Sequence, residues 1–217
     1  MKKFELTNEF VTNMFGTKLF RIRALVEFGD VEAGELGGYV EKESNLGHDD
    51  NAWVYGDARV YDNALVYDNA RVYGDAQVSG DARVYDNARV YGDAGVYGDA
   101  RVYGNALVCG NARVYDNARV YGDAWVYGNA RVCGDALVCG DARVCGNGDY
   151  AYAHGFGSVN RTTTFFRLKD GGVGVRCGCF YGTLAQFRDK IRETHGETKK
   201  AQEYLMLADL MKLRFEK

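Results

Sequence analysis

The stretch Asn51-Ala-Trp-Val-Tyr-Gly-Asp-Ala-Arg-Val-Tyr-Asp62 contains two copies of a six-residue pattern that continues unbroken to Gly146. Residues 51–146 form 16 such hexads, each with Asp or Asn first, Ala second, Val fourth, Tyr, Cys or Ser fifth, and Gly or Asp sixth. Alternate residues of a strand point to opposite faces, so the alanine and valine of a hexad share one side. The Gly or Asp that follows tolerates the positive φ of a tight corner. The pattern therefore predicts short strands joined by corners, with alanine and valine inside.

Strands and corners repeated without interruption predict a coil rather than a flat sheet. The pattern resembles the hexapeptide repeat of left-handed parallel β-helices, in which an aliphatic residue is followed four places later by a small one, as Val60 is by Ala64. This resemblance implies a left-handed, three-sided coil with three hexads per turn. The 16 hexads would then make 16/3, or about 5.3, coils, stacked at the usual strand spacing of roughly 4.8 Å.

The composition agrees with a continuous β structure. Proline is absent from the 217 residues, glycine occurs 28 times, and 47% of the residues are hydrophobic. Each proline would remove a donor from a strand ladder, so its absence suits such a fold. The start of the chain lacks the apolar stretch of a signal peptide, and no apolar run approaches the ~18 residues of a membrane span. We therefore expect a cytoplasmic protein without a membrane partner, whose six cysteines are reduced thiols.

The flanks of the repeats predict two caps. Residues 1–50 are expected to form a small N-terminal β cap and a degenerate first coil at 36–46, with a strand at 17–28 that pairs with residues 3–6. Residues 147–217 are expected to form an α+β module, a hairpin of strands 162–168 and 173–179 followed by two helices. The first helix begins at a capping box, Thr183 with Gln186, and ends near Gly196; the second spans 198–213 and covers the last coil. The predicted fold is therefore mainly β, a left-handed parallel β-helix at 51–146 between these caps.

The third and fifth residues of the hexads point outward and give the β-helix its surface. Every third hexad falls on the same face, so the sequence assigns these residues to three faces. The most regular, which we call the arginine–tyrosine face, holds Leu65, Arg83, Arg101, Arg119 and Leu137 beside Tyr67, Tyr85, Tyr103, Tyr121 and Cys139. The second face holds Trp53, Arg71, Arg89, Leu107, Trp125 and Arg143, and the third holds Arg59, Gln77, Gly95, Arg113 and Arg131.

The arginine–tyrosine face supplies the first candidate binding site, with Arg83, Arg101, Arg119, Tyr85, Tyr103 and Tyr121 as its residues. Arginine and tyrosine ladders could bind phosphates and stack bases, bind a protein, or form an inert solvated surface. The repeats contain 9 Arg and 12 Asp, and the whole chain has a net charge of −3. Both values argue against nucleic acid and favour a protein partner or self-association.

Enzymatic signals are weak. The pattern also resembles that of hexapeptide acyltransferases, which use a histidine base and loops leaving the coil, but these hexads contain no histidine and no insertion. Of His48, His154 and His195, only His154 merits a test as a base. Cys133, Cys139 and Cys145 fall on different faces, and the Cys177-Gly-Cys179 pair lacks the second pair of a zinc site. We therefore expect no enzyme, no metal and no cofactor, with an acyltransferase as the remote alternative.

Both flanks resemble proteins of bacteriophages. The run from Gly34 to Leu46 is similar to the opening of uncharacterised hexapeptide-repeat proteins of bacteria and their phages. The segments 160–167, 177–180 and 187–195 are similar to a C-terminal module of phage and prophage proteins. The resemblance implies a phage-encoded binding protein that acts on a host protein in the bacterial cytoplasm, as an inhibitor or anti-defence factor.

The alternative function belongs to a different class: the protein could bind a small ligand or sequester a nucleotide with its C-terminal module. Arg161, with Thr162 and Thr164, places a guanidinium beside hydroxyls that could hold a phosphate. Alternation along the strand turns Thr163 to the other side. The alternative to a ligand site is that these residues only form a hairpin strand rich in β-branched residues.

The regularity of the arginine–tyrosine face also predicts a homodimer. Two antiparallel copies could place each arginine row against corner aspartates of the other copy, such as Asp68 and Asp86, with the tyrosines between them. A trimer like those of the transferases and a monomer are the alternatives.

Overall fold

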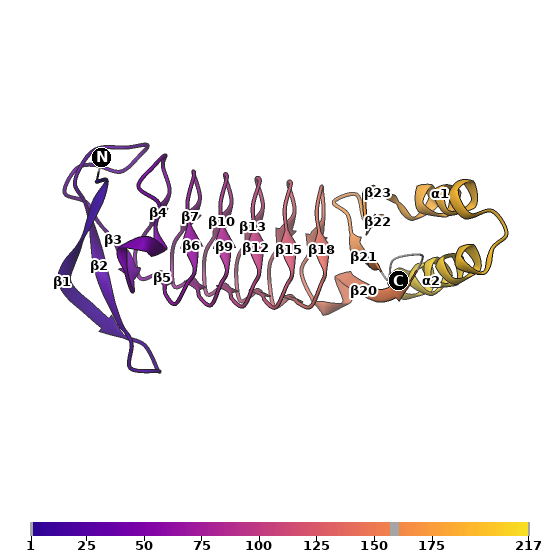
Figure 1. The fold of residues 1–217 in the computed structure, drawn as a ribbon, viewed down its shortest axis with the longest axis horizontal. Coiled ribbons are helices and arrows are strands. Elements are labelled where there is room, and N and C mark those ends of the chain that lie inside the picture. Colours follow the sequence, from indigo (N-terminus) through magenta and orange to yellow (C-terminus); the bar gives the residue numbers. More distant parts are fainter. Residues whose placement is uncertain (1, 157–160, 217) are drawn as a thin grey trace.

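The computed structural model describes residues 2–156 and 161–216 and has the shape of a rod (Figure 1). A small N-terminal sheet lies at one end, the coils form the middle, and a second sheet with two helices lies at the other end. Asn160, the first residue of one phage-like segment, lies outside the described residues. None of the helices described is long and apolar enough to cross a membrane.

The N-terminal sheet consists of β1 (Phe4–Thr12), β2 (Lys18–Ala24) and β3 (Leu36–Val40). β1 and β2 are antiparallel with Phe4 opposite Ala24, which confirms the predicted pairing at this end of the chain. β3 pairs in parallel with β5 (Arg59–Val60), with Val40 opposite Val60, so β1, β2 and β3 continue one of the sheets of the β-helix. This first turn therefore takes 20 residues, whereas three hexads take 18, and it contains the 3-10 helix η1 (Glu43–Asn45).

The hexads form sixteen two-residue strands, each made of the third and fourth residues of its hexad. They are β4 (Trp53–Val54), β5 (Arg59–Val60), β6 (Leu65–Val66), β7 (Arg71–Val72), β8 (Gln77–Val78), β9 (Arg83–Val84), β10 (Arg89–Val90), β11 (Gly95–Val96), β12 (Arg101–Val102), β13 (Leu107–Val108), β14 (Arg113–Val114), β15 (Arg119–Val120), β16 (Trp125–Val126), β17 (Arg131–Val132), β18 (Leu137–Val138) and β19 (Arg143–Val144). Every third strand pairs in parallel, so three sheets run along the rod. The hexad strands divide among the sheets as the sequence predicts for the three faces, and the sheet of the third face also includes β1, β2 and β3.

Alanine and valine fill the interior of the β-helix. All 16 alanines and all 16 valines of the hexads are at most 1% exposed. Burying a valine side chain fully stabilises a fold by about 1.5–3 kcal/mol relative to leaving it exposed. Because every hexad contributes the same two buried residues, the coils share one interior and differ in what they present outward.

The corners explain the sixth residue of the hexads. Fifteen of the 16 sixth residues have positive φ, eleven of them glycine and four aspartate. Each corner aspartate also accepts a hydrogen bond from the corner amide of the next coil; Asp86 Oδ2, for example, accepts from Gly104 N at 3.1 Å. The corners with aspartate in place of glycine therefore gain an additional hydrogen bond between successive coils.

The C-terminal sheet has four antiparallel strands in the order β20 (Tyr150–Phe156), β21 (Arg161–Arg167), β22 (Val173–Cys177) and β23 (Phe180–Thr183). The 3-10 helix η2 (Asn147–Asp149) precedes it. The predicted hairpin is β21 with β22, and the sheet extends beyond it by β20 and β23. β22 ends at Cys177 because Gly178 has a φ of +58° and reverses the chain. α1 (Leu184–His195) and α2 (Lys199–Phe215) follow, and α1 begins at the capping box predicted from the sequence.

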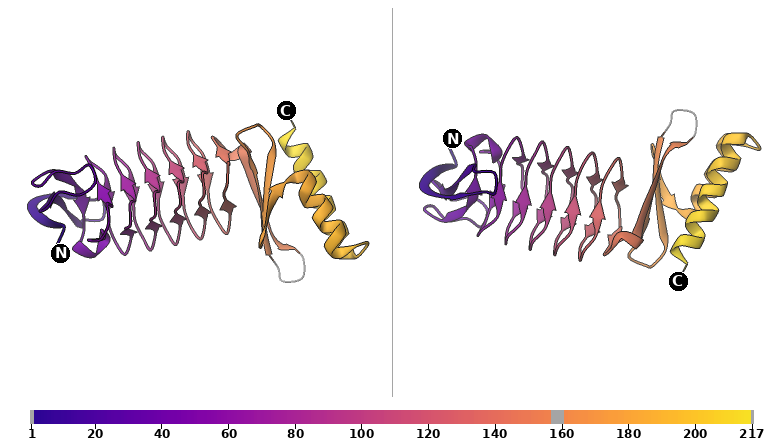
Figure 2. Two further views of the ribbon diagram at one scale, coloured as in Figure 1. Left: turned by 90° about the horizontal axis from the view of Figure 1, so that it is seen from above. Right: turned by 90° about the horizontal axis from the view of Figure 1, so that it is seen from below.

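The sheet separates the helices from the coils (Figure 2). Phe166 packs into the core of the β-helix, whereas its neighbour Phe165 packs against the two helices. Thr164 Oγ1 accepts a hydrogen bond from Leu137 N at 2.9 Å and so ties the sheet to the last complete coil. The prediction that the second helix covers the last coil is therefore wrong. Alternation along β21 gives the sheet two apolar faces, and this sheet, rather than the helix, covers the end of the β-helix.

Candidate functional site

The arginine–tyrosine face is the five-stranded sheet β18-β15-β12-β9-β6. Arg101 lies in register between Arg83 on one neighbouring strand and Arg119 on the other. Leu65 and Leu137 occupy the two ends of the same row. The structure thus brings together the three arginines that the sequence predicts as binding residues.

The tyrosines of this face form a stacked column. The ring centroids of Tyr67, Tyr85, Tyr103 and Tyr121 are 5.0, 4.9 and 4.9 Å apart in succession, and neighbouring rings are within 4° of parallel. Burial raises the pKa of Tyr67, Tyr85 and Tyr103. The phenols therefore remain neutral hydroxyl groups at physiological pH. A stacked column of half-buried rings presents a rigid aromatic strip beside the arginine row.

The three arginines have no internal partner among the described residues, a property that they share with Arg59, Arg89 and Arg131 but not with Arg71, Arg113 and Arg143. No ion pair or hydrogen bond joins the Arg83, Arg101 or Arg119 guanidinium to another described residue. By contrast, Arg143 Nη1 donates to Asp123 O at 2.9 Å, and its guanidinium lies 4.2 Å from the Trp125 ring centroid. Like charges opposite each other on neighbouring strands destabilise a sheet. The row is therefore a set of charges without internal compensation.

The C-terminal sheet adds a fourth arginine at the end of the tyrosine column. Arg176 Nη1 donates to Cys179 O at 3.3 Å, while its Nε is buried without a partner among the described residues. Burial raises the pKa of Cys139 and of Tyr121, and the nearby Arg176 charge opposes that effect in both. No pattern in the sequence predicts this contact, because it depends on how β22 packs against the coils.

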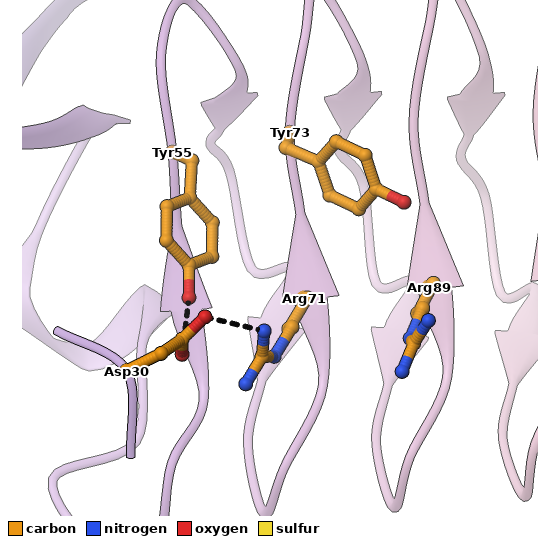
Figure 3. A pocket seen from close by; sticks show the side chains of 5 residues that line it. All are labelled: Asp30, Tyr55, Arg71, Tyr73 and Arg89. Carbon is orange, nitrogen blue, oxygen red and sulfur yellow. Dashed lines mark hydrogen bonds and ion pairs between the residues drawn. The ribbon is translucent and has the colours of Figure 1, made fainter. Parts of the chain in front are cut away.

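A hollow of about 350 Å³ lies where the N-terminal cap meets the second face (Figure 3). Asp30 Oδ2 accepts from Arg71 Nη1 at 2.7 Å, and Asp30 Oδ1 accepts from the Tyr55 hydroxyl at 3.1 Å. Burial alone would raise the pKa of Asp30, but the Tyr55 hydrogen bond and the Arg71 charge together lower it. Figure 3 shows Arg89 beyond Arg71 along the same row. The Asp30 carboxylate is already neutralised, so we interpret the contact as a structural one that holds the N-terminal cap against the coils.

The predicted phosphate cradle of Arg161, Thr162 and Thr164 does not form. Thr164 faces the coils and bonds Leu137, and Thr162 Oγ1 lies 2.8 Å from His154 Nδ1. Arg161 faces the helices, where it lines a cavity with Cys177. Because successive residues of β21 alternate between the two faces of the sheet, these side chains cannot hold one phosphate.

The histidines lie in separate parts of the two caps. His48 stacks on Phe4 at 4.5 Å and its Nε2 lies 2.9 Å from Glu43 Oε1. His195, the last residue of α1, stacks on Tyr204 at 6.0 Å, and Figure 1 shows α1 at the opposite end of the rod from the N-terminal sheet. Within residues 2–156 and 161–216, no group of three or more His, Cys, Asp or Glu side chains could hold a metal ion.

A chain that winds through repeated coils of parallel strands is a β-solenoid, and this protein is a repeat β-helix protein. Its coils are similar to a particular family, because they match the model of the YdcK beta solenoid repeat. The matches are the overlapping segments 52–67, 58–74, 64–80, 76–92, 82–98, 94–110, 100–114, 112–128 and 124–140. No curated protein matches the chain.

Proposed function

We propose that this β-solenoid is a non-enzymatic binding protein whose arginine–tyrosine face binds an acidic surface of another protein. The observation that carries the proposal is the row of Arg83, Arg101 and Arg119, held in register on neighbouring strands without an acidic partner among the described residues. Carboxylates of a partner would offset the repulsion within the row. Arginine suits this role because its planar guanidinium binds a carboxylate through two hydrogen bonds.

The tyrosine column supports a protein partner. Tyrosine is enriched in protein interfaces, where it buries an apolar ring and offers a hydroxyl group at its edge. The stacked rings of Tyr85 and Tyr103 are already ordered, so binding would cost little additional side-chain entropy. The column and the arginine row together offer an apolar strip beside a cationic strip.

The surrounding charges favour a protein over a nucleic acid. The coils contain 12 aspartates against 9 arginines, and the corner residues Asp68 and Asp86 lie at the edge of this face. A polyphosphate that runs along the face would meet these corner carboxylates, whereas a folded protein can match the arginine row locally. Recovery of nucleic acid instead of protein would therefore contradict the proposal.

The resemblance of both flanks to phage and prophage proteins extends the proposal. It supports a partner that is a host protein of the bacterial cytoplasm, bound by a phage-encoded inhibitor or anti-defence factor. The β-solenoid fold alone does not specify such a role.

A pull-down from bacterial lysate with two matched triple variants tests the proposal. One bait carries Glu in place of Arg83, Arg101 and Arg119. The control bait carries the same three charge reversals on the third face, at Arg59, Arg113 and Arg131. We expect the control and the unchanged protein to recover the same protein and the first bait to lose it. Equal recovery by both variants would show that the arginine–tyrosine face is not the interface.

The same face is also a candidate for self-association, because a second copy could supply the acidic groups. Asp86 uses Oδ2 to accept the Gly104 amide, and its other oxygen has no partner among the described residues. Antiparallel rods could therefore set one copy's arginines against the other copy's corner carboxylates. We propose a homodimer of this form as the second use of the face.

A further inference from the structure

The C-terminal module contains a cavity that plays no part in the proposed binding face. It has a volume of about 290 Å³ and lies between the helix side of the sheet and the helices α1 and α2. Arg161, Cys177 and Phe180 line it from the sheet and its turn, and Ile191, His195 and Tyr204 line it from the helices. Pockets that bind small molecules are often near this size and combine an apolar wall with a few polar groups.

The wall of the cavity is aromatic and well packed. The Phe187 ring lies 5.4 Å from the Phe180 ring and 5.9 Å from the Tyr204 ring, between centroids. Phe187 and Ile191 are each 4% exposed, so they are fixed by the core of the module. A planar apolar group would find a preformed surface here.

The polar groups of the cavity are cationic or neutral. Arg161, Lys190 and His195 line it, and none of its lining side chains among the described residues is an Asp or Glu. Lys190 is paired with Glu193 at 3.0 Å, whereas no ion pair of Arg161 is present among the described residues. The Arg161 guanidinium therefore offers an uncompensated positive charge at the edge of an aromatic wall.

Two further contacts lie at the edge of the cavity. The Arg161 guanidinium lies against Gly178, whose positive φ of +58° favours glycine. Tyr204 donates its hydroxyl hydrogen to Phe156 O at 3.2 Å, which orients the tyrosine ring at the side of the cavity. The aromatic wall of the cavity is thus held by the packing of the module, and the Arg161 guanidinium lies at its edge.

We infer that this cavity binds a small organic anion with a planar apolar body. The Arg161 guanidinium binds the carboxylate or phosphate head group through two hydrogen bonds, and the rings of Phe180 and Phe187 contact the body. This site uses the helix face of the sheet, so it is independent of the arginine–tyrosine face and of the function proposed for it.

Isothermal titration calorimetry of the full chain with matched probes tests the inference. The probes are 2-naphthoate, 2-naphthyl phosphate, the neutral 2-naphthamide, and acetate, which has the charge without the body. We expect at least one naphthyl anion to bind at one site per chain, at least tenfold more tightly than the amide, and acetate to give no heat of binding. The tighter of the two anions identifies the head group, and either result supports the site.

Three variants locate the binding. Arg161→Gln should reduce the affinity for the naphthyl anion to that for the amide, whereas Arg131→Gln, an exposed arginine on the third face, should leave it unchanged. Thr194→Trp, at an exposed position on the cavity wall, should abolish binding of all naphthyl probes without unfolding the module. Equal affinity for anion and amide, an unchanged preference in Arg161→Gln, or no binding of either anion would overturn the inference.

Discussion

Replacement of Gly104 by alanine should destabilise the β-helix by about 1–2 kcal/mol, because a left-handed backbone disfavours an L side chain by that amount. Gly104 has a φ of +69°, and a Cβ there would lie 3.0 Å from Gly122 N and 3.4 Å from Gly122 Cα. Both contacts are with the backbone of the next corner, which can move only by disturbing the ladder. The lower entropy of the unfolded alanine variant cannot compensate at a backbone conformation that alanine does not favour.

Asparagine at the same position should cost less than alanine. Asp86, the corner residue one coil earlier, has a φ of 56° and binds the Gly104 amide through its carboxylate. An asparagine at 104 tolerates the left-handed region and can accept the Gly122 amide in the same way, and such a hydrogen bond contributes about 1 kcal/mol. We therefore expect the order of stability glycine, asparagine, alanine.

Gly146 provides the control for this series, because it is also the sixth residue of a hexad. Its φ is −150°, and nothing lies within 4 Å of a Cβ built on it. Gly146→Ala should therefore change the free energy of unfolding by less than about 0.5 kcal/mol. Urea unfolding followed by far-ultraviolet circular dichroism measures all variants. An alanine at 104 as stable as glycine, or more stable than asparagine, would refute the reasoning.

Three further predictions concern pH, the C-terminal sheet and assembly. Burial raises the phenol pKa of Tyr103, and mainly burial raises that of Tyr55 to about 12. Because tyrosine in the unfolded chain titrates near 10, the stabilisation from these neutral phenols should be fully present below about pH 10 and lost as the pH rises toward 12. Unfolding midpoints that stay constant from pH 9 to 12 would contradict this. Thr164→Val leaves the Leu137 amide without its acceptor and should lower the free energy of unfolding by about 1–3 kcal/mol. Thr162→Val, whose hydrogen bond is exposed, should lower it by less than about 0.5 kcal/mol. Equal decreases in thermal unfolding would contradict the role of Thr164 in holding the C-terminal sheet on the last coil. Sedimentation at several concentrations should show a dimer that Tyr103→Glu dissociates, and a monomer at all concentrations would remove the self-association proposal.

The sequence predicts the β-helix well because its determinants are local and periodic. Ala100 and Val102 are buried for the same reason as every other alanine and valine of the hexads, the alternation of side chains along a strand. A period of six with three hexads per turn then places Arg83, Arg101 and Arg119 on one sheet without knowledge of any long-range contact. The composition of the arginine–tyrosine face can therefore be predicted from the sequence.

The C-terminal module is less predictable because its contacts are set by packing between distant segments. Alternation alone shows that Thr164 and Arg161 lie on opposite faces of β21, but it does not show which face meets the coils. Arg176 reaches the tyrosine column only because β22 lies over the last coils, and Gly178 ends that strand two residues before the predicted boundary. The cavity beside Arg161 likewise depends on how two helices dock on the sheet.

Site-specific photo-cross-linking in bacterial cells tests the central claim most directly. A photoreactive p-benzoylphenylalanine replaces Tyr85 on the arginine–tyrosine face or, as the control, Tyr97, an exposed tyrosine on the third face. The account predicts that the probe at 85 forms an adduct with one other protein, that the probe at 97 does not, and that Glu at Arg83, Arg101 and Arg119 abolishes the adduct. The same adduct from both positions, or none from position 85, would contradict it.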